Sequence, residues 1–204
     1  MAEPRRIGVF GGTFDPIHAA HLAVAQAALT QARLDEVLFV VAAIPPHKQH
    51  AVRAGAEDRY AMVVAAVEAL HEPRFTVSRI ELDREGLSYT SDTLREIQAA
   101  NPDAELFLII GADALGDLPG WHDPTGILRA ARLLVVPRPG FSPEDVPELA
   151  GRFQLLHFDE VPVSSTGLRA HIAAGKGAVE DLPPAVAAII RERGLYRGTA
   201  AGNA

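Results

Sequence analysis

The chain has 204 residues, of which 48% are apolar and 22% charged, a composition typical of folded globular proteins that excludes wholesale disorder. Its formal net charge of -7 argues against non-specific binding to nucleic acid or to an anionic membrane, since both attract basic surfaces. It contains no cysteine, which excludes disulfides, thiolate catalysis and Cys-ligated zinc.

The length predicts one domain, at residues 1–197, followed by a Gly/Ala-rich tail at 198–204 that we expect to be disordered. The first residues lack the apolar run of a signal peptide, and no stretch approaches the roughly 18 apolar residues that span a bilayer. We therefore expect a cytoplasmic protein.

Strand-like and helical stretches alternate along the chain. The predicted strands, several of them near-continuous apolar runs typical of strands buried on both faces, lie at residues 5–11, 36–43, 75–82, 105–111, 132–137 and 153–158. The predicted helices lie at residues 19–34, 57–70, 92–100, 124–130, 166–174 and 184–193. This alternation predicts an α/β fold with a doubly wound, Rossmann-like, mostly parallel sheet and helices on both faces. In such folds the ligand binds beyond the carboxyl ends of the strands.

The sequence GGTFDPIHAAH, at residues 11–21, joins the first predicted strand to the first predicted helix. Gly11 and Gly12 allow a sharp turn and a close approach of the backbone to a ligand. Pro16 fixes the corner, and Asp15 can hydrogen-bond within it.

Two histidines, His18 and His21, follow this turn on one face of the starting helix, near its positive end. Their imidazoles can donate hydrogen bonds to phosphate oxygens. The spacing alone is also typical of surface or packed residues, and without a nearby third ligand the pair falls short of a zinc set. The glycines and the strand end favour the phosphate interpretation.

Loops after later strands carry further candidates. The sequence PPHK, ending at Lys48, places cations at the carboxyl end of the second strand, or is simply a solvated loop. LSYTSDTL, at residues 87–94, ends in a helix start whose N–H groups suit a carboxylate, unless side chains merely cap the helix. The loop at residues 111–122 holds the only tryptophan, Trp121, which either covers an edge of the core or stacks on a flat heteroaromatic ring.

The last candidate is VSSTGLR, at residues 163–169. Ser164, Ser165 and Thr166 precede a predicted helix and would cap it by ordinary rules. Alternatively, the N–H groups and partial positive charge of that helix start bind a phosphate chain, with Arg169 one turn further offering a permanent charge.

These motifs carry a resemblance to a known group. GGTFDPIH followed by His21 resembles the H-x-G-H signature of the nucleotidyltransferase superfamily, α/β enzymes that transfer a nucleotide onto a phosphate, and VSSTGLR resembles its second signature, I-S-S-T-x-x-R. Ala20 stands where the first signature has glycine. PPHK, SYTxDT, GxDxxxxLPxWH and VPRPGF are similar to the pattern of nicotinate-nucleotide adenylyltransferases, and the likeness extends from Ile7 to about Tyr196.

The resemblance implies a role for each candidate residue. Those implied to act on the phosphates during catalysis are His18, His21 and Arg169. Those implied to bind ATP, with Asp113 on its ribose, are Gly11, Gly12, Thr13, Asp113, Ser164, Ser165 and Thr166. Those implied to bind the second substrate, with Trp121 on its pyridine ring and Thr90 at its carboxylate, are Lys48, Thr90, Trp121 and Arg138.

The implied reaction joins ATP and nicotinate mononucleotide to give nicotinate adenine dinucleotide and pyrophosphate. The acceptor phosphate, already ionised at pH 7, attacks the α-phosphorus in line, so catalysis consists of positioning and charge stabilisation. His21 would donate to the α-phosphate and His18 would hold the phosphate chain, while Arg169 and Ser165 would take the leaving pyrophosphate. Mg²⁺ would be held mainly by the ATP phosphates, with no metal site expected on the protein itself.

Three other functions stay open. An adenylyltransferase that prefers nicotinamide mononucleotide is the nearest, followed by a phosphopantetheine adenylyltransferase and by a nucleotide-binding module without turnover. The expected partners are ATP and nicotinate mononucleotide, and neither nucleic acid nor a membrane is expected. The sequence does not determine whether the chain forms a homo-oligomer.

Overall fold

The computed structural model describes residues 3–46, 52–138, 140–142, 146–159, 161–176 and 180–197, with Glu148 described by its backbone alone. The predicted substrate-binding residue Lys48 and the predicted tail at 198–204 lie outside these ranges. No helix in the described ranges is long and apolar enough to cross a membrane.

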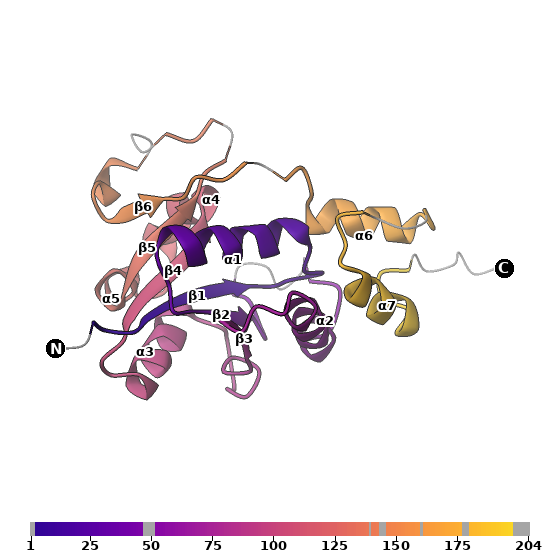
Figure 1. Cartoon of the computed structure of the whole chain (residues 1–204), viewed down its shortest axis with the longest axis horizontal. Helices are drawn as coiled ribbons and strands as arrows, with labels where there is room; N and C mark the ends of the chain where they lie inside the picture. The colour runs from indigo at the N-terminus through magenta and orange to yellow at the C-terminus, as the bar shows by residue number, and fades with distance from the viewer. Residues whose placement is uncertain are drawn as a thin grey trace.

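The strands form one parallel sheet (Figure 1). In chain order they are β1 (Arg6–Gly12), β2 (Glu36–Val41), β3 (Phe75–Ser78), β4 (Glu105–Gly111), β5 (Ala131–Val136) and β6 (Phe153–Leu155). Their order across the sheet is β3-β2-β1-β4-β5-β6, and each neighbouring pair is parallel. The chain therefore builds outward from β1 to β3 and then crosses back to build β4 to β6 on the other side, which confirms the doubly wound topology.

Helices cover both faces of this sheet, as predicted. The α-helices are α1 (Ala19–Gln31), α2 (Ala56–Glu68), α3 (Thr90–Ala100), α4 (Ala112–Asp117), α5 (Pro124–Ala130), α6 (Ser165–Ala173) and α7 (Pro184–Glu192), and two 3-10 turns are η1 (Leu118–Gly120) and η3 (Pro147–Leu149). Side chains of α1, α2, α6 and α7 pack into one apolar cluster, and those of α3, α4 and α5 into the other. In Figure 1, α6 and α7 lie beyond the carboxyl end of β1.

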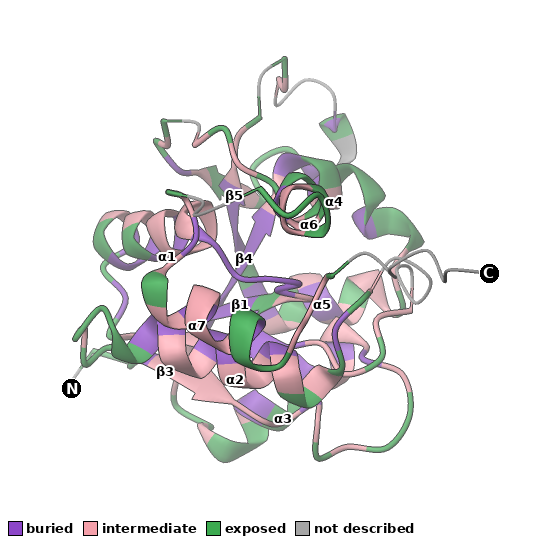
Figure 2. Cartoon of the chain, turned by 90° about the vertical axis from the view of Figure 1, so that its right-hand side faces the viewer, coloured by how far each residue is buried: buried purple, intermediate pink, exposed green. Residues whose placement is uncertain are grey.

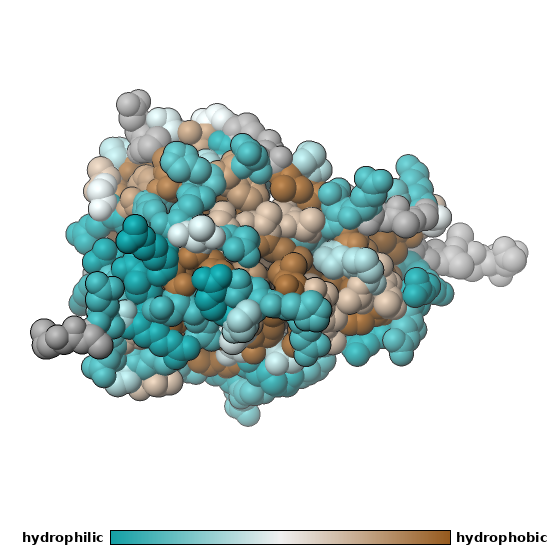
Figure 3. Space-filling model, in the orientation of Figure 1, coloured by the Kyte–Doolittle hydropathy of each residue, from teal (hydrophilic) through white to brown (hydrophobic). Residues whose placement is uncertain are grey.

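The two apolar clusters follow from the two-residue period of the strands. Phe10 of β1 and Ile109 of β4 point into the cluster on the α1 side, whereas their neighbours Val9 and Leu108 point into the cluster on the α3 side. Figure 2 shows the buried residues concentrated in the strands and on the helix faces turned toward them. Polar residues dominate the outline of the molecule, and apolar ones show mainly toward the centre of the face in Figure 3.

The carboxyl ends of β1 and β4 part from each other. The two strands are paired only as far as Val9 and Leu108. Beyond that point β1 stays paired with β2 up to Gly12, and β4 stays paired with β5 up to Gly111. The chain then leaves β1 toward α1 on one face and β4 toward α4 on the other. This is the switch point at which doubly wound sheets bind their ligands.

Several predicted segments differ from the structure, among them the second and sixth strands, which end at Val41 and Leu155 rather than at residues 43 and 158. The first helix ends at Gln31 rather than at residue 34, because Arg33 adopts a left-handed conformation with φ 49°. The third strand ends at Ser78 rather than at residue 82, because the N–H groups of residues 82 and 83 both bond to the carbonyl of Arg79 and form a turn. The loop expected at residues 111–122 is mostly helical and contains α4 and η1.

Candidate active site

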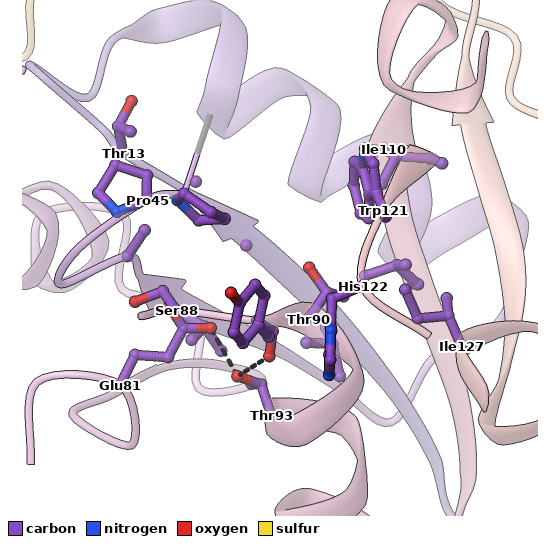
Figure 4. Close-up of a pocket in the computed structure, with 18 of the residues that line it drawn as sticks. Thr13, Pro45, Glu81, Ser88, Thr90, Thr93, Ile110, Trp121, His122 and Ile127 are labelled. Carbon is purple, nitrogen blue, oxygen red and sulfur yellow. Dashed lines mark hydrogen bonds between the residues drawn. The ribbon is translucent and has the colours of Figure 1, made fainter. Parts of the chain in front are cut away.

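A cavity of about 190 Å³ opens between the parted ends of β1 and β4 (Figure 4). Its walls come from the ends of β1, β2 and β4, the start of α3 and the segment after η1. Five residues predicted from the sequence as ligand-binding line it, namely Gly11, Gly12, Thr13, Thr90 and Trp121. The structure thus brings residues from three separate stretches of the chain into one space.

Gly11 keeps part of this cavity open. Gly11 lines the cavity, and a Cβ atom added there would meet no atom within 4 Å. At Gly12 an added Cβ would lie 3.0 Å from the Phe14 ring, which is tighter than ordinary packing. The first glycine is therefore explained by space for a ligand and the second by internal packing.

Trp121 lies at the border between the core and the cavity. It follows η1, packs against the apolar cluster on the α3 side and lines the cavity at the same time. Its neighbour His122 stacks on Tyr89, with ring centroids 4.3 Å apart at 30°, and this contact joins the segment after η1 to the start of α3. Both stacked residues also line the cavity, and neither was predicted from the sequence as a site residue.

The start of α3 has no side-chain cap. Its N-cap residue is Tyr89, which makes no capping hydrogen bond, so the idea that Ser and Thr side chains cap this helix is wrong. Thr90, the first helical residue, lines the cavity. A helix start without a side-chain cap keeps its partial positive charge for an anion in the cavity.

A buried carboxylate that was not predicted from the sequence, that of Glu81, also lines the cavity. It accepts a 2.6 Å hydrogen bond from the hydroxyl of Thr93. Burial raises the pKa of Glu81, while hydrogen bonds from Thr93 and Ser88 oppose that rise. The sequence signal was weak, because Glu81 lies in an alternating stretch that predicted a strand.

The two predicted histidines lie together at the start of α1 and do not line the cavity, whose lining includes Thr13 earlier in the same loop. Their rings stack with centroids 3.8 Å apart at 30°. The backbone N–H of His18, the N-cap residue, donates to Nδ1 of His21 at 3.3 Å. A neutral His21 whose Nδ1 accepts must carry its proton on Nε2, which makes Nε2 a donor.

His18 is buried and electrically neutral at pH 7. Burial lowers its pKa to about 4, although the carboxylate of Asp181 acts in the opposite direction. Its Nδ1 atom is buried and makes no hydrogen bond to any described residue. A neutral imidazole offers one N–H group, so His18 can donate one hydrogen bond and adds no positive charge.

Asp15 connects distant parts of the site. Its buried carboxylate accepts hydrogen bonds from the backbone N–H groups of Arg53 and Ala54, at 2.7 and 3.1 Å, and from the hydroxyl of Tyr196 at 2.7 Å. The prediction from the sequence that Asp15 hydrogen-bonds within its own corner, beside Pro16, is wrong. A buried carboxylate needs several donors, and these come from other segments instead.

The two sequence signatures meet at this loop. The hydroxyl of Ser165 donates to the carbonyl of Pro16 at 3.0 Å, and Arg169 donates to the carbonyl of Asp15 at 2.8 Å and to Oγ1 of Thr166 at 3.2 Å. Ser164 caps α6 by accepting from the N–H of residue 167, so the capping interpretation is correct for this helix. The hydroxyl proton of Ser165 is therefore engaged with the carbonyl of Pro16.

Arg59 is a further residue that was not predicted from the sequence. It is 1% exposed, and its guanidinium donates to the carbonyls of Thr13, Ala42, Ala43 and Ala54. These bonds join the segments that follow β1 and β2. Burial lowers the pKa of Arg59, and Asp15 raises it. Its position on the apolar face of α2, three residues before Met62, was the available signal.

Asp113 and Arg138 pair with each other outside the cavity. Their side chains form an ion pair at 3.0 Å, and each is 66% exposed. Asp113 lies in the first turn of α4, after β4, and Arg138 lies just after β5. Neither lines the cavity, so both sit at the same edge of the sheet but apart from Thr90 and Trp121.

Within the described ranges, no three His, Asp or Glu side chains are grouped so that they could hold a metal ion.

The sequence is similar to those of known proteins over most of its length. The sequence model of the cytidylyltransferase-like family matches residues 9–171. A Thermus thermophilus protein named "Probable nicotinate-nucleotide adenylyltransferase" is 47% identical over 192 residues, which cover 94% of this chain and 100% of that protein. Proteins of the same name from Shouchella clausii and Saccharopolyspora erythraea are 44% and 42% identical, over 94% and 97% of this chain and 97% and 92% of their own lengths.

Comparison with solved structures gives the same fold. The Plasmodium falciparum nicotinic acid mononucleotide adenylyltransferase complexed with NaAD is similar with a TM-score of 0.79 at 17% identity, over 94% of this chain and 97% of that one. The same protein complexed with APC gives a TM-score of 0.76 at equal identity and coverage.

Proposed function

The chain belongs to the cytidylyltransferase-like family and, within it, to the nicotinate-nucleotide adenylyltransferases, and we propose that it transfers the adenylyl group of ATP to nicotinate mononucleotide. The products are nicotinate adenine dinucleotide and pyrophosphate. The observation that carries this proposal is the cavity between β1 and β4. In it the open backbone of Gly11, the helix start at Thr90 and the ring of Trp121 meet, beside the loop that leads to the two histidines.

The mononucleotide fits the cavity by its chemistry. A pyridine ring can stack on Trp121, and its carboxylate suits the uncapped start of α3 at Thr90 better than a neutral amide does. The phosphate of the mononucleotide then points toward the Gly11 end, where the loop to His18 begins. This arrangement supports acid preference over amide preference.

The phosphates of ATP are assigned to the two signatures. Arg169 and the start of α6 supply a permanent charge and N–H groups for the β- and γ-phosphates. His21 donates from Nε2 to the α-phosphate, because its Nδ1 accepts from the backbone of His18. Ser165 contributes its backbone N–H, since its hydroxyl already donates to Pro16.

The reaction needs no base from the protein. An ionised oxygen of the mononucleotide phosphate forms a bond to the α-phosphorus, and the bond from that phosphorus to the bridging oxygen of pyrophosphate breaks on the opposite side. The Nε2 proton of His21 and the charge of Arg169 stabilise the negative charge that moves onto the α-phosphate and the leaving pyrophosphate. We assign Mg²⁺ to the ATP phosphates, and no step above depends on a protein–metal bond.

Pyrophosphate release tests the proposal. The full chain is incubated with ATP, Mg²⁺ and, separately, nicotinate mononucleotide, nicotinamide mononucleotide or phosphopantetheine. The proposal predicts fast release with the first and slow release with the other two. Equal rates with the first and second would remove the assignment of the carboxylate to α3. Binding of ATP without release in any mixture would support a nucleotide-binding module instead.

A further inference from the structure

Glu81 is the one acidic residue that lines the cavity in the described part of the chain. It lies in the turn after β3 and is only 7% exposed. No step of the proposed reaction uses it. A buried carboxylate in the cavity of an enzyme for anionic substrates calls for a specific reason, because a negative charge there would oppose binding.

The hydrogen bonds of Ser88 leave its hydroxyl proton available to Glu81. The hydroxyl oxygen of Ser88 accepts from the backbone N–H groups of Ala43 and Ile44, at 3.0 and 3.2 Å. With both acceptor positions used, the hydroxyl proton is free to donate, and the Ser88 hydroxyl lowers the pKa of the Glu81 carboxylate against the effect of burial. The N–H of Ser88 also donates to the carbonyl of Ile44 at 3.0 Å.

Thr93 makes the second connection to Glu81. Its hydroxyl donates to Oε1 of Glu81 at 2.6 Å and accepts from Arg84 at 3.0 Å. The carbonyl of Tyr89 lies 3.2 Å from the same hydroxyl oxygen. Figure 4 shows Glu81, Ser88 and Thr93 on one side of the cavity, with Thr90 beside them. One carboxylate therefore holds two hydroxyls that flank the turn from Ser88 to Thr90.

We propose that Glu81 is a positioning residue that holds the turn from Ser88 to Thr90 in place for the carboxylate of the mononucleotide. The proposal rests on the proposed function, because that function puts the pyridine carboxylate at the start of α3. Glu81 acts through Ser88 and Thr93 and does not touch the substrate. It connects the end of β2, through Ala43 and Ile44, to the first turn of α3. The distance between these two walls of the cavity is thereby fixed.

The structure predicts how two substitutions at Glu81 differ. In Glu81→Gln the amide oxygen accepts from Ser88, and the amide nitrogen donates to Thr93, whose own proton turns to the carbonyl of Tyr89. The network survives without the negative charge. In Glu81→Leu the hydroxyl of Ser88 loses Glu81 as an acceptor and Thr93 keeps only the carbonyl of Tyr89, so residue 81 no longer ties the turn and the turn is free to shift.

The test measures kcat and KM for each substrate by pyrophosphate release. We expect Glu81→Leu to raise KM for nicotinate mononucleotide roughly tenfold or more, with kcat and KM for ATP changed less than about threefold. Glu81→Gln should restore KM to within about threefold of the wild-type value. The matched control is Glu36→Leu, which also removes a carboxylate with two partners, Arg5 and Thr76, but at the amino end of the sheet. Glu36→Leu should leave kcat, KM for nicotinate mononucleotide and KM for ATP unchanged.

The outcomes separate this proposal from the proposed function. If the wild-type chain releases no pyrophosphate with nicotinate mononucleotide, the proposed function fails. If the wild-type chain is active and Glu81→Leu changes both KM values equally, or lowers kcat alone, the positioning role is wrong. A Glu81→Gln variant as impaired as Glu81→Leu would also overturn it. Ser88→Ala, which breaks one arm of the network, should raise the same KM by a smaller factor, and it replaces Glu81→Leu if that variant does not fold.

Discussion

The hydroxyl of Tyr196 donates a 2.7 Å hydrogen bond to the carboxylate of Asp15, across 181 positions of sequence. The carbonyl of the same Asp15 accepts a 2.8 Å hydrogen bond from Arg169. The residue that leads into the histidine loop is therefore held by both α6 and the segment after α7. The position of the loop between β1 and α1 therefore depends on contacts with the last helices of the described chain.

Removal of the Tyr196 hydroxyl should lower the stability of the fold. Tyr196→Phe keeps the ring but leaves a buried carboxylate with one donor fewer, so we expect the free energy of unfolding to fall by about 1–2 kcal/mol. Urea denaturation measures the loss. Tyr60→Phe is the matched control, because the Tyr60 ring mainly packs under the guanidinium of Arg79. Equal losses in the two variants would contradict a special role for the bond to Asp15.

The buried His18 should make the fold sensitive to acid. Its pKa is about 4 in the folded chain, against 6.5 for an unperturbed histidine, so below pH 6.5 the unfolded chain binds the proton and the folded chain does not. The contribution of neutral His18 to the free energy of unfolding is therefore fully present above about pH 6.5. It is lost as the pH falls toward the pKa of the folded state. Linkage gives a loss of about 2 kcal/mol between pH 7.5 and pH 5.

The measurement for His18 is the free energy of unfolding of wild type and His18→Leu at these two pH values. The variant should lack that part of the pH dependence. His157→Gln, at an exposed position, is the control and should keep the wild-type dependence. A His18→Leu variant with an unchanged slope would show that the imidazole is not the group responsible.

A side chain at residue 11 should block the cavity without unfolding the chain. In Gly11→Val the new atoms enter space that holds no protein atom near the Cβ position, so we expect a stability change within about 1 kcal/mol. Activity should fall at least about tenfold, because the substrate loses that space. Gly116→Ala, in α4 and also free of close neighbours, should leave activity unchanged. Full activity of Gly11→Val would place the substrate elsewhere.

The ring of Trp121 should act on one substrate only. Trp121→Ala removes the aromatic face that lines the cavity, so KM for nicotinate mononucleotide should rise by about tenfold while KM for ATP stays near the wild-type value. Because Trp121 also packs on the core, a loss of stability is expected as well, and the measurement is made below the unfolding temperature. A change confined to ATP would mean that the ring binds the other nucleotide.

The fold and several residues that line the cavity could be predicted from local sequence. Continuous apolar runs such as those of β4 and β5 specify strands buried on both faces, and glycines with histidines at a strand end specify a ligand loop. Gly11 stood out because it follows a strand directly, and Trp121 because it is the only tryptophan and lies in a predicted loop.

The missed residues depend on partners that only the fold brings to them. Glu81 and Asp15 each receive hydrogen bonds from segments that no local pattern connects to them, and a carboxylate in a turn is ordinarily solvated. The turn after Ser78 was predicted as strand because its apolar and polar residues alternate as in a half-buried strand. Such residues are recognised only once the fold has buried them.

Substitutions of His21 can separate its structural contact with His18 from its proposed role in catalysis. Its Nδ1 accepts from the His18 backbone, while its Nε2 proton is the one assigned to the α-phosphate. In His21→Asn the side-chain oxygen can keep the contact to His18 but the distal donor is gone, so turnover should fall about 100-fold or more with stability close to wild type. His21→Gln, whose longer amide reaches the Nε2 position, should recover part of that loss. Pyrophosphate release at saturating substrates and urea denaturation measure the two effects, and near-normal turnover in His21→Asn would remove His21 from the mechanism.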